Sequence, residues 1–452
     1  MAVLRRILIA NRGEIAVRII RTCAALGIET VLAVSDADGD SMPARLADAV
    51  VRLGPAPPAA SYLDVKAVVS AAVAAGADAI HPGYGFLSEK AQLATACEAA
   101  GLVFIGPTPA QLDAVGDKVR ARGHAEAAGL PTVPGGAVDG TAAAADLAAV
   151  IGWPVLVKAV GGGGGRGLRP VPGPAALADT IAVAMAEAAG AFGDPRIYLE
   201  RYVHPGRHVE VQVLGDGERV IHVGDRDCSV QRRYQKLVEE APAPLLGDKL
   251  RAEMRQAAIA FAERLRYRGL GTVEFLVDCE RGGFYFLEMN ARIQVEHPVT
   301  EAISGLDLVA EQIWVAEGNR LRLGQDDIEL TGHAIECRIN AEDWSDSFRP
   351  SPGTIAAASF PAESWIRVDT HVQAGALVPP WYDSLLAKLI VTGRDRAEAV
   401  ARMRDALARC QIAGVATTLP MQVELMNSDG FGSGGVDTSY LDRLVLGQVS
   451  HG

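Results

Sequence analysis

Residues 288–296 alternate strictly between polar and apolar side chains, and the polar set mixes acid, amide and guanidinium groups. Successive side chains of an extended chain point to opposite faces, so the polar set shares one face. The alternative is an amphipathic strand with a solvated outer face, for which such a mixture is untypical. His297 and Pro298 follow and are expected to end the strand. The polar positions are Glu288, Asn290, Arg292, Gln294 and Glu296.

The length of this face limits what it can do as one unit. Fully extended, Glu288 and Glu296 would lie ~26 Å apart at about 3.3 Å per residue, which is more than one reaction centre spans. Either the segment bends, or its two ends serve different halves of a reaction. Both alternatives fit an enzyme that joins two substrates.

A second carboxylate is expected beside Glu288. Residues 272–276 have a strand pattern that contains Glu274, and Gly282 with Gly283 permits a hairpin turn back to residues 284–288. Two adjacent carboxylates repel each other unless a cation lies between them, and Mg²⁺ is typically held by one or two carboxylates together with substrate phosphates. The alternative is a structural ion pair between Glu274 and a nearby arginine.

A run of glycines follows the predicted strand that contains Lys158. Gly162, Gly164 and Gly167 satisfy GxGxxG, but the prolines of residues 168–172 cannot open the helix that a dinucleotide site requires, and no GK[ST] is present. Five consecutive glycines, residues 161–165, are costly to order and fit a mobile flap whose N–H groups close over phosphates. A disordered surface loop is the alternative.

Two further segments concentrate polar groups. Residues 226–236 are densely cationic and include Lys236, although a solvated basic loop would look similar. Residues 333–340 alternate again and place Glu336, Arg338 and Asn340 on one face, for which a solvated strand face is the alternative.

The elements that must position these groups fall into distinct regions. The first region alternates strands with helical periodicity, which predicts a parallel sheet with helices on both faces, ending near Gly116. From residue 197 to about 299 the pattern is mostly strands with one strong helix, and a last region begins near Gly332. The predicted strands are 7–9, 30–34, 79–80 and 103–105, and the predicted helices are 14–26, 249–266 and 396–410.

Composition narrows the class of protein. A chain of 452 residues suggests two or three domains. The net charge of −12 argues against nucleic acid or an anionic membrane as a partner, so an anionic substrate needs a local basic pocket. No apolar run approaches the ~20 residues of a membrane span. Because the six cysteines are scattered without a CxxC pair, neither a disulfide framework nor a zinc site is expected. A cytoplasmic location is therefore expected.

Taken together, these segments resemble the biotin carboxylase branch of the ATP-grasp superfamily over essentially the whole chain. Residues 288–298 carry the part of the resemblance that is specific to biotin-dependent carboxylases. The other matching segments are NRGEIA (11–16), HPGYGFLSE (81–89), GDK (116–118), Lys158 with its glycine run, 226–236, 332–343 and 382–384.

The resemblance implies an α/β fold in three parts. A Rossmann-like parallel-sheet domain is expected over residues 1–117, and an ATP-grasp domain over 118–331 with a mobile glycine-rich lid at about 131–204. An α+β biotin carboxylase C-terminal domain is expected over 332–447.

The resemblance also implies an ATP-dependent ligase that carboxylates biotin with bicarbonate, with Mg²⁺ or Mn²⁺ as the metal. The implied metal ligands are Glu274, Glu288 and Asn290. Lys236, Arg292, Gln294 and Val295 would hold bicarbonate, with Glu296 as its base and Arg338 stabilising the biotin enolate. The implied nucleotide residues are Lys118, Lys158, Gly163, Gly164, Gly165, Glu200, Arg201, Tyr202, Val203, His208, Gln231, Tyr234 and Leu276.

One position departs from the family, which usually has histidine where this chain has Tyr234. Tyrosine donates a hydrogen bond but does not become a cation. No Ala-Met-Lys-Met-type segment is present, so biotin is expected on a separate carrier protein, with a carboxyltransferase on another chain and a homodimer of this one. Other candidates are an ATP-grasp carboxylate–amine ligase or carbamoyl-phosphate-type enzyme, and a non-catalytic ATP-binding regulatory subunit.

Overall fold

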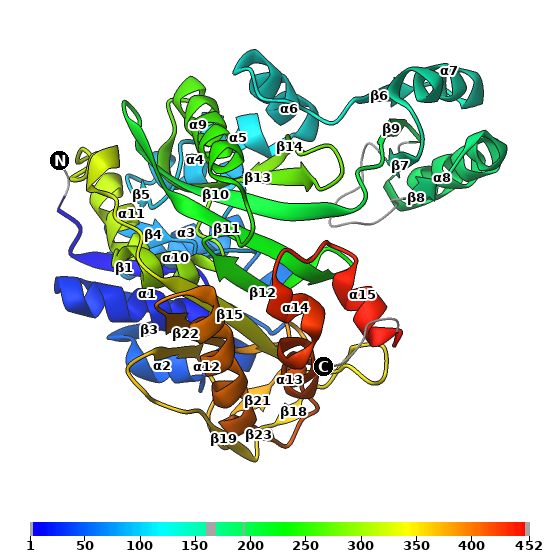
Figure 1. The fold of residues 1–452 in the computed structure, drawn as a ribbon. Coiled ribbons are helices and arrows are strands. Elements are labelled where there is room, and N and C mark those ends of the chain that lie inside the picture. Colours follow the sequence, from blue (N-terminus) through cyan, green and yellow to red (C-terminus); the bar gives the residue numbers. More distant parts are fainter. Residues whose placement is uncertain (1–2, 160–168, 193–194, 448–452) are drawn as a thin grey trace.

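The N-terminal region builds a parallel sheet in the computed structural model, which describes residues 3–159, 169–192 and 195–447 (Figure 1). The sheet confirms the predicted doubly wound arrangement, in which β1 lies between β2 and β4. The strand order is β3 (Ala49–Gly54), β2 (Glu29–Ser35), β1 (Arg6–Ile9), β4 (Ala79–His81) and β5 (Val103–Phe104). The helices are α1 (Gly13–Leu26), α2 (Met42–Leu46), α3 (Val65–Ala74), α4 (Ala91–Ala99) and α5 (Pro109–Gly116).

Burial on both faces explains the continuous apolar runs of this sheet. Leu8 packs into one hydrophobic cluster, and Ile7 and Ile9 pack into another on the opposite face. Ile15 and Ile19 of α1 join the second cluster, as their helical spacing predicts. The packing of β1 and α1 therefore fixes where α1 begins. Glu14 lies in the first turn of that helix, so its position is fixed as well.

A large antiparallel sheet of eight strands runs through the central and C-terminal regions. Its strand β15 starts just after the predicted boundary between residues 331 and 332, and pairs with β12, so the sheet continues across that point. The order is β14 (Gly283–Asn290), β13 (Arg268–Asp278), β10 (Gly206–Asp216), β11 (Val220–Arg232), β12 (Gln235–Ala241), β15 (His333–Asn340), β22 (Leu385–Gly393) and β20 (Ile366–Thr370). Helices of the same region are α6 (Lys118–Ala127), α9 (Asp248–Arg264), α10 (His297–Ser304) and α11 (Leu308–Ala316).

A smaller antiparallel sheet with two helices stands to one side of the large sheet, at the upper right of Figure 1, and has a hydrophobic core of its own. We call this part the lid. At Gly135 a Cβ atom would lie 2.5 Å from the carbonyl oxygen of Leu199, so the close pairing of β6 with β9 requires glycine there. Gly163, Gly164 and Gly165 lie outside the described residues. The lid contains β6 (Gly135–Val138), β9 (Ile197–Arg201), β7 (Val155–Ala159), β8 (Arg169–Val171), α7 (Thr141–Ile151) and α8 (Leu177–Phe192).

The C-terminal region adds helices and short strands to the far edge of the large sheet. Helix α12 packs on β22 through Met403 and Leu407. Among the described residues, no helix combines the length and apolar character that a membrane crossing requires. The helices are α12 (Arg396–Arg409), α13 (Leu419–Asn427), α14 (Asp429–Ser433) and α15 (Tyr440–Val445). The short strands are β16 (Glu342–Asp343), β17 (Arg349–Pro350), β18 (Gly353–Thr354), β19 (Ala357–Ser359), β21 (Leu377–Val378) and β23 (Gln411–Ala413).

The extended strand expected over residues 288–296 is wrong in its second half. Strand β14 ends at Asn290, and residues 291–296 form a bend without regular secondary structure. His297 and Pro298 do not simply end a strand, because they begin α10, where proline is favoured in the first turn. Of the two alternatives for this segment, the structure shows the bend.

Candidate active site

A cleft of about 1540 Å³ is lined by residues of the lid, the large sheet and both terminal regions. Every predicted site residue that the structure describes lines this cleft, except Glu296, which is fully buried behind it. The predicted residues in its wall are Lys118, Lys158, Glu200, Arg201, Tyr202, Val203, His208, Gln231, Tyr234, Lys236, Glu274, Leu276, Glu288, Asn290, Arg292, Gln294, Val295 and Arg338.

Strands β13 and β14 place Glu274 and Glu288 directly opposite each other, as the predicted hairpin requires. Burial and the charge of Glu274 raise the pKa of Glu288, although Lys118 opposes them. Burial would raise the pKa of Glu274 too, but Lys236 and His208 hold it well below its usual range. Glu274 therefore carries its charge beside Lys236 and His208, and the alternative of a structural pair with arginine does not hold.

Lys236 brings three buried carboxylates together. Its Nζ lies 2.6 Å from Glu210 Oε2, 2.8 Å from Glu274 Oε1 and 2.8 Å from Glu296 Oε1. Burial alone would lower the pKa of Lys236, but these three charges raise it well above the usual value. Lys236 is thus a permanent cation at the wall of the cleft.

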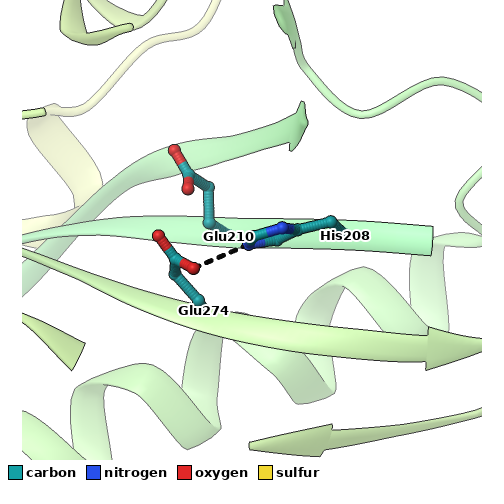
Figure 2. Close-up of side chains that lie close together, drawn as sticks. All are labelled: His208, Glu210 and Glu274. Atoms are coloured by element: carbon teal, nitrogen blue, oxygen red, sulfur yellow. Dashed lines mark ion pairs between the residues drawn. The ribbon is translucent and has the colours of Figure 1, made fainter. Parts of the chain in front are cut away.

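Figure 2 shows the part of this cluster that lies on neighbouring strands. His208 Nε2 lies 2.8 Å from Glu274 Oε2. Glu210 follows His208 at the next position of β10 that points to the same face. The ligand atoms of this trio lie within 4.8 Å of one another, which resembles a metal site. Because Lys236 already contacts both carboxylates, the trio is compensated by side chains of the protein itself.

The bend after β14 is held by contacts between its own polar groups and the sheet. Arg292 donates to Gln294 Oε1 at 2.8 Å and to Asn290 Oδ1 at 3.0 Å. Gln294 in turn donates to Glu274 Oε1 at 3.0 Å. Side chains that a straight strand would spread along one face are therefore folded back over Glu274, and the solvated-face alternative is excluded.

Glu296 ends the bend, with none of its side chain exposed. Besides Lys236, its carboxylate accepts a hydrogen bond from Arg338 at 3.0 Å. Burial would raise the pKa of Glu296, but Lys236, Arg338 and Arg226 outweigh burial and lower it. Glu296 is therefore an ionised carboxylate. Residue types alone could not show whether burial or the nearby cations would control its pKa, and in the structure the cations do.

Arg338 lies on β15 between two acids. Its Nη2 is 2.6 Å from Glu239 Oε1 as well as 3.0 Å from Glu296 Oε2. The neighbouring Glu336 of the same strand is fully buried, so this face of β15 is not a solvated one. Arg338 is held on the cleft wall by two carboxylates that leave part of its planar donor fork for another acceptor.

The lid side of the cleft is more open. Lys158 on β7 forms an ion pair with Glu200 on β9, and its side chain is partly exposed. Arg233 and Tyr234 form the two-residue turn between β11 and β12, and both have positive φ, 48° and 67°, as a tight hairpin turn of this kind requires. Tyr234 is 56% exposed, so the alternative of a solvated basic loop applies only to this tip of residues 226–236.

Glu274 and Glu288 fit a magnesium ion by their chemistry and register. The two carboxyl groups lie opposite each other, and the pKa of Glu274 is lowered while that of Glu288 is raised. Hard oxygen ligands of this kind suit Mg²⁺. Asn290 fits less directly, because its oxygen accepts from Arg292 and its nitrogen donates to Glu274 at 2.7 Å. An amide ligand at this position would exchange its partner.

Three buried residues of this region had no role predicted from the sequence. Glu210 contacts both Lys236 and Arg226, Glu239 contacts Arg338, and Lys388 donates to the carbonyl oxygen of Val295. For Glu210 a signal was present, since polar residues at positions 208, 210 and 212 alternate with valines along one strand. Lys388 has no such signal, because apolar residues surround it in β22.

Comparisons with known proteins agree along the whole chain. Residues 3–112 match the family described as "Biotin carboxylase, N-terminal domain", and residues 336–443 match "Biotin carboxylase C-terminal domain". Residues 117–323 match "Carbamoyl-phosphate synthase L chain, ATP binding domain".

Similar full-length proteins and structures carry related descriptions. The biotin carboxylase of Nostoc sp. is 49% identical over 97% of this chain and 99% of that protein. A biotin carboxylase from Campylobacter jejuni, solved as a β-γ-ATP complex, is 45% identical and gives a TM-score of 0.93 over 98% and 99% of the two chains.

A third protein is the biotin carboxylase domain dimer of 2-oxoglutarate carboxylase from Hydrogenobacter thermophilus, with MgADP, ADP and bicarbonate. It is 44% identical and gives a TM-score of 0.92 over 98% of each chain. With the opposed carboxylates, the folded-back arginine and the buried glutamate of the cleft, these matches show that the chain belongs to the biotin carboxylase family.

Proposed function

We propose that this chain carboxylates biotin with ATP and bicarbonate, as the first half-reaction of an acyl-CoA-type carboxylase. The observation that carries the proposal is the contact of one buried carboxylate, Glu296, with both Lys236 and Arg338. One cation lies toward the opposed acids of β13 and β14, and the other lies on β15. A base placed between them serves both of the substrates that meet there.

ATP would bind between the lid and the large sheet. Lys118 and Lys158 supply positive charge to the wall of the cleft for its phosphates, and the hydroxyl of Tyr234 supplies a hydrogen-bond donor where the family usually has histidine. When bound, Mg²⁺ would neutralise phosphate charge, held by Glu274 and Glu288 with Asn290 beside them. The contribution of the protein to phosphoryl transfer is then mainly positioning and charge neutralisation.

Bicarbonate would bind at the bend, where Lys236, Arg292, Gln294 and Val295 line the cleft. Glu296 is ionised and can accept the bicarbonate proton. An anion that attracts Lys236 and Arg338 away from Glu296 removes part of the charge that lowers the pKa of Glu296. Substrate binding would therefore make this base stronger at the moment when it is needed.

The deprotonated bicarbonate oxygen then attacks the γ-phosphorus, and the bond from phosphorus to the ADP oxygen breaks, which gives carboxyphosphate and ADP. Carboxyphosphate yields CO₂ and phosphate, and the phosphate takes the N1′ proton of biotin. Arg338 would hydrogen-bond the ureido oxygen of the biotin enolate, for which its planar guanidinium is suited. The nitrogen attacks CO₂ and forms the new C–N bond.

The deciding experiment measures ATP hydrolysis by the purified chain, with and without bicarbonate and free biotin. We expect hydrolysis that requires bicarbonate and rises with biotin, and transfer of ¹⁴C from bicarbonate to biotin. A rate of ATP hydrolysis that does not change when biotin is added, or no hydrolysis at all, would refute the proposed function. A chain that binds ATP without hydrolysing it would instead support a regulatory subunit.

We further propose that biotin arrives on a carrier protein and that a carboxyltransferase on another chain uses the product. The near-complete coverage of a separate biotin carboxylase supports this division. The dimer named for the Hydrogenobacter domain supports a homodimer.

The six cysteines are unpaired, which supports a reducing, cytoplasmic location. Domain boundaries near residues 117 and 331 remain our proposal.

A further inference from the structure

The side chain of Lys388 has no exposed surface, and Lys388 does not line the cleft. It lies on β22, directly opposite Arg338 on β15 and Asp369 on β20. Directly opposed residues of neighbouring strands share a face of the sheet, so Lys388 and Arg338 point to the same side. That side is the one on which Glu296 contacts Arg338.

The ammonium of Lys388 has partners from different parts of the chain. It donates to the carbonyl oxygen of Val295 at 2.8 Å, and lies 3.0 Å from Glu14 Oε2 and 3.8 Å from Asp369 Oδ2. The first contact is with the bend, the second with the first turn of α1, and the third with the neighbouring strand. A single buried charge therefore joins the N-terminal region, the bend and the C-terminal region.

Glu14 extends this connection to another residue of the cleft wall, Tyr84. Its Oε1 accepts a short hydrogen bond from the hydroxyl of Tyr84, and Tyr84 lines the cleft. Glu14 does not line the cleft but lines a smaller cavity of about 240 Å³ at the ends of β1 and β4, whose wall also includes Tyr84. Tyr84 and Val295, which come from different regions, are thus linked through two residues that lie outside the cleft.

We propose that the Glu14–Lys388 pair is a positioning element that fixes the Val295–Glu296 backbone relative to Tyr84. This inference rests on the proposed function and deepens it. Neither residue lines the cleft in which the substrates would bind. Both act through Val295 and Tyr84, so they are positioning residues rather than catalytic ones.

The bend needs such an element because residues 291–296 have no strand or helix to hold their backbone. The carboxylate of Glu296 is held by Lys236 and Arg338, and both of these are proposed to contact substrates. The contact from Lys388 to Val295 involves neither of them, so it would persist when substrates attract them. The base then keeps its position while its charged neighbours change partners, and a displacement of about 1 Å at a reacting group can cost on the order of 100-fold in rate.

The test compares Lys388→Met, Glu14→Gln, Tyr84→Phe and the double variant of positions 14 and 388 with the wild type. For Lys388→Met we expect the bicarbonate-dependent kcat to fall on the order of 100-fold, with the KM for ATP unchanged. Glu14→Gln should have a smaller effect of the same kind. The double variant should be no slower than Lys388→Met, because residues that act as one unit are not additive.

Arg255→Met is the matched control. It removes a largely buried ion pair with Asp225, 2.5 Å long, while Arg251 still compensates that carboxylate. Neither arginine lines the cleft. We expect Arg255→Met to lower Tm without changing kcat, so that lost stability and lost positioning are separated.

The outcomes distinguish the inference from the function on which it rests. A wild-type chain without bicarbonate-dependent hydrolysis defeats both. A working wild type with variants at positions 14 and 388 that lose only Tm, as the control does, defeats the positioning element alone. Additive losses in the double variant would also defeat it. If Lys388→Met does not fold, Glu14→Gln and Tyr84→Phe decide, because a kcat at the wild-type value in both overturns the inference.

Discussion

Two buried lysines on the large sheet, Lys236 and Lys388, have the same charge but different surroundings. Lys236 contacts three carboxylates, and 12% of its side chain is exposed at the cleft. Lys388 is fully buried, and its nearest partner is a main-chain carbonyl oxygen. Because only Lys236 reaches the cleft, only Lys236 can exchange a carboxylate for an anionic substrate. Access to the cleft, rather than charge, separates binding a substrate from positioning the backbone.

The largest expected effect concerns the residue that both lysines serve. Glu296→Gln keeps the shape of the side chain but removes the base, so bicarbonate-dependent turnover should fall by about 10²- to 10⁴-fold. The affinity for ATP should stay the same, because Glu296 lies behind the cleft wall. Steady-state kinetics and nucleotide binding by calorimetry check this. Loss of ATP binding would place Glu296 with the structural or metal residues instead.

Replacing Lys236, the lysine that reaches the cleft, should have a different kinetic effect from replacing Lys388. Lys236→Met should lower kcat/KM for bicarbonate by about 10²- to 10³-fold, as removal of a preorganised donor does, and should raise the KM for bicarbonate. Lys388→Met should leave that KM near the wild-type value. Initial rates over a range of bicarbonate concentrations measure both. Equal rises in the two values of KM would remove the distinction between the lysines.

A pH effect on stability should come from Glu239, which faces Arg338 but no lysine at contact distance. Burial raises the pKa of Glu239 to about 7, although Arg338 opposes it. A carboxyl whose pKa is higher in the folded state stabilises the fold at low pH, and that stability is lost as pH rises from its unfolded pKa through about 7.

Tm of the wild type should therefore carry a downward contribution between about pH 5 and pH 7 that the uncharged Glu239→Gln lacks. The difference between the two Tm curves isolates this residue from other titrating groups. Parallel curves over this range would mean that Arg338 keeps Glu239 ionised throughout.

The smallest effect on stability is expected in the lid. Lys158 pairs with Glu200 at a partly exposed position, so Lys158→Met should change the free energy of unfolding by about 1 kcal/mol or less. The KM for ATP should nevertheless rise, because Lys158 lines the cleft. Chemical denaturation and steady-state kinetics measure the two quantities. A large loss of stability would show that buried and exposed lysines differ less in this protein than their surroundings indicate.

Local patterns in the sequence determined much of the fold and part of the site. The parallel sheet followed from alternating strand and helix periods, and the opposition of Glu274 and Glu288 followed from one hairpin. The alternation along residues 333–340 likewise placed Arg338 on one face of a strand. These features depend on neighbours within one element or one turn, which is why residue types and spacing were sufficient.

Only the tertiary structure decided where residues 291–296 turn and what surrounds Glu296. Lys236 lies 60 positions before Glu296 in the chain, and Lys388 lies 93 positions after Val295. Contacts of that separation depend on how strands of the large sheet are ordered, which no period within one segment encodes. The residue pattern placed Glu296 on a polar face, and the resemblance to biotin carboxylases named it as a candidate base. Its ionised state follows from Lys236, Arg338 and Arg226, which the folded sheet places near it.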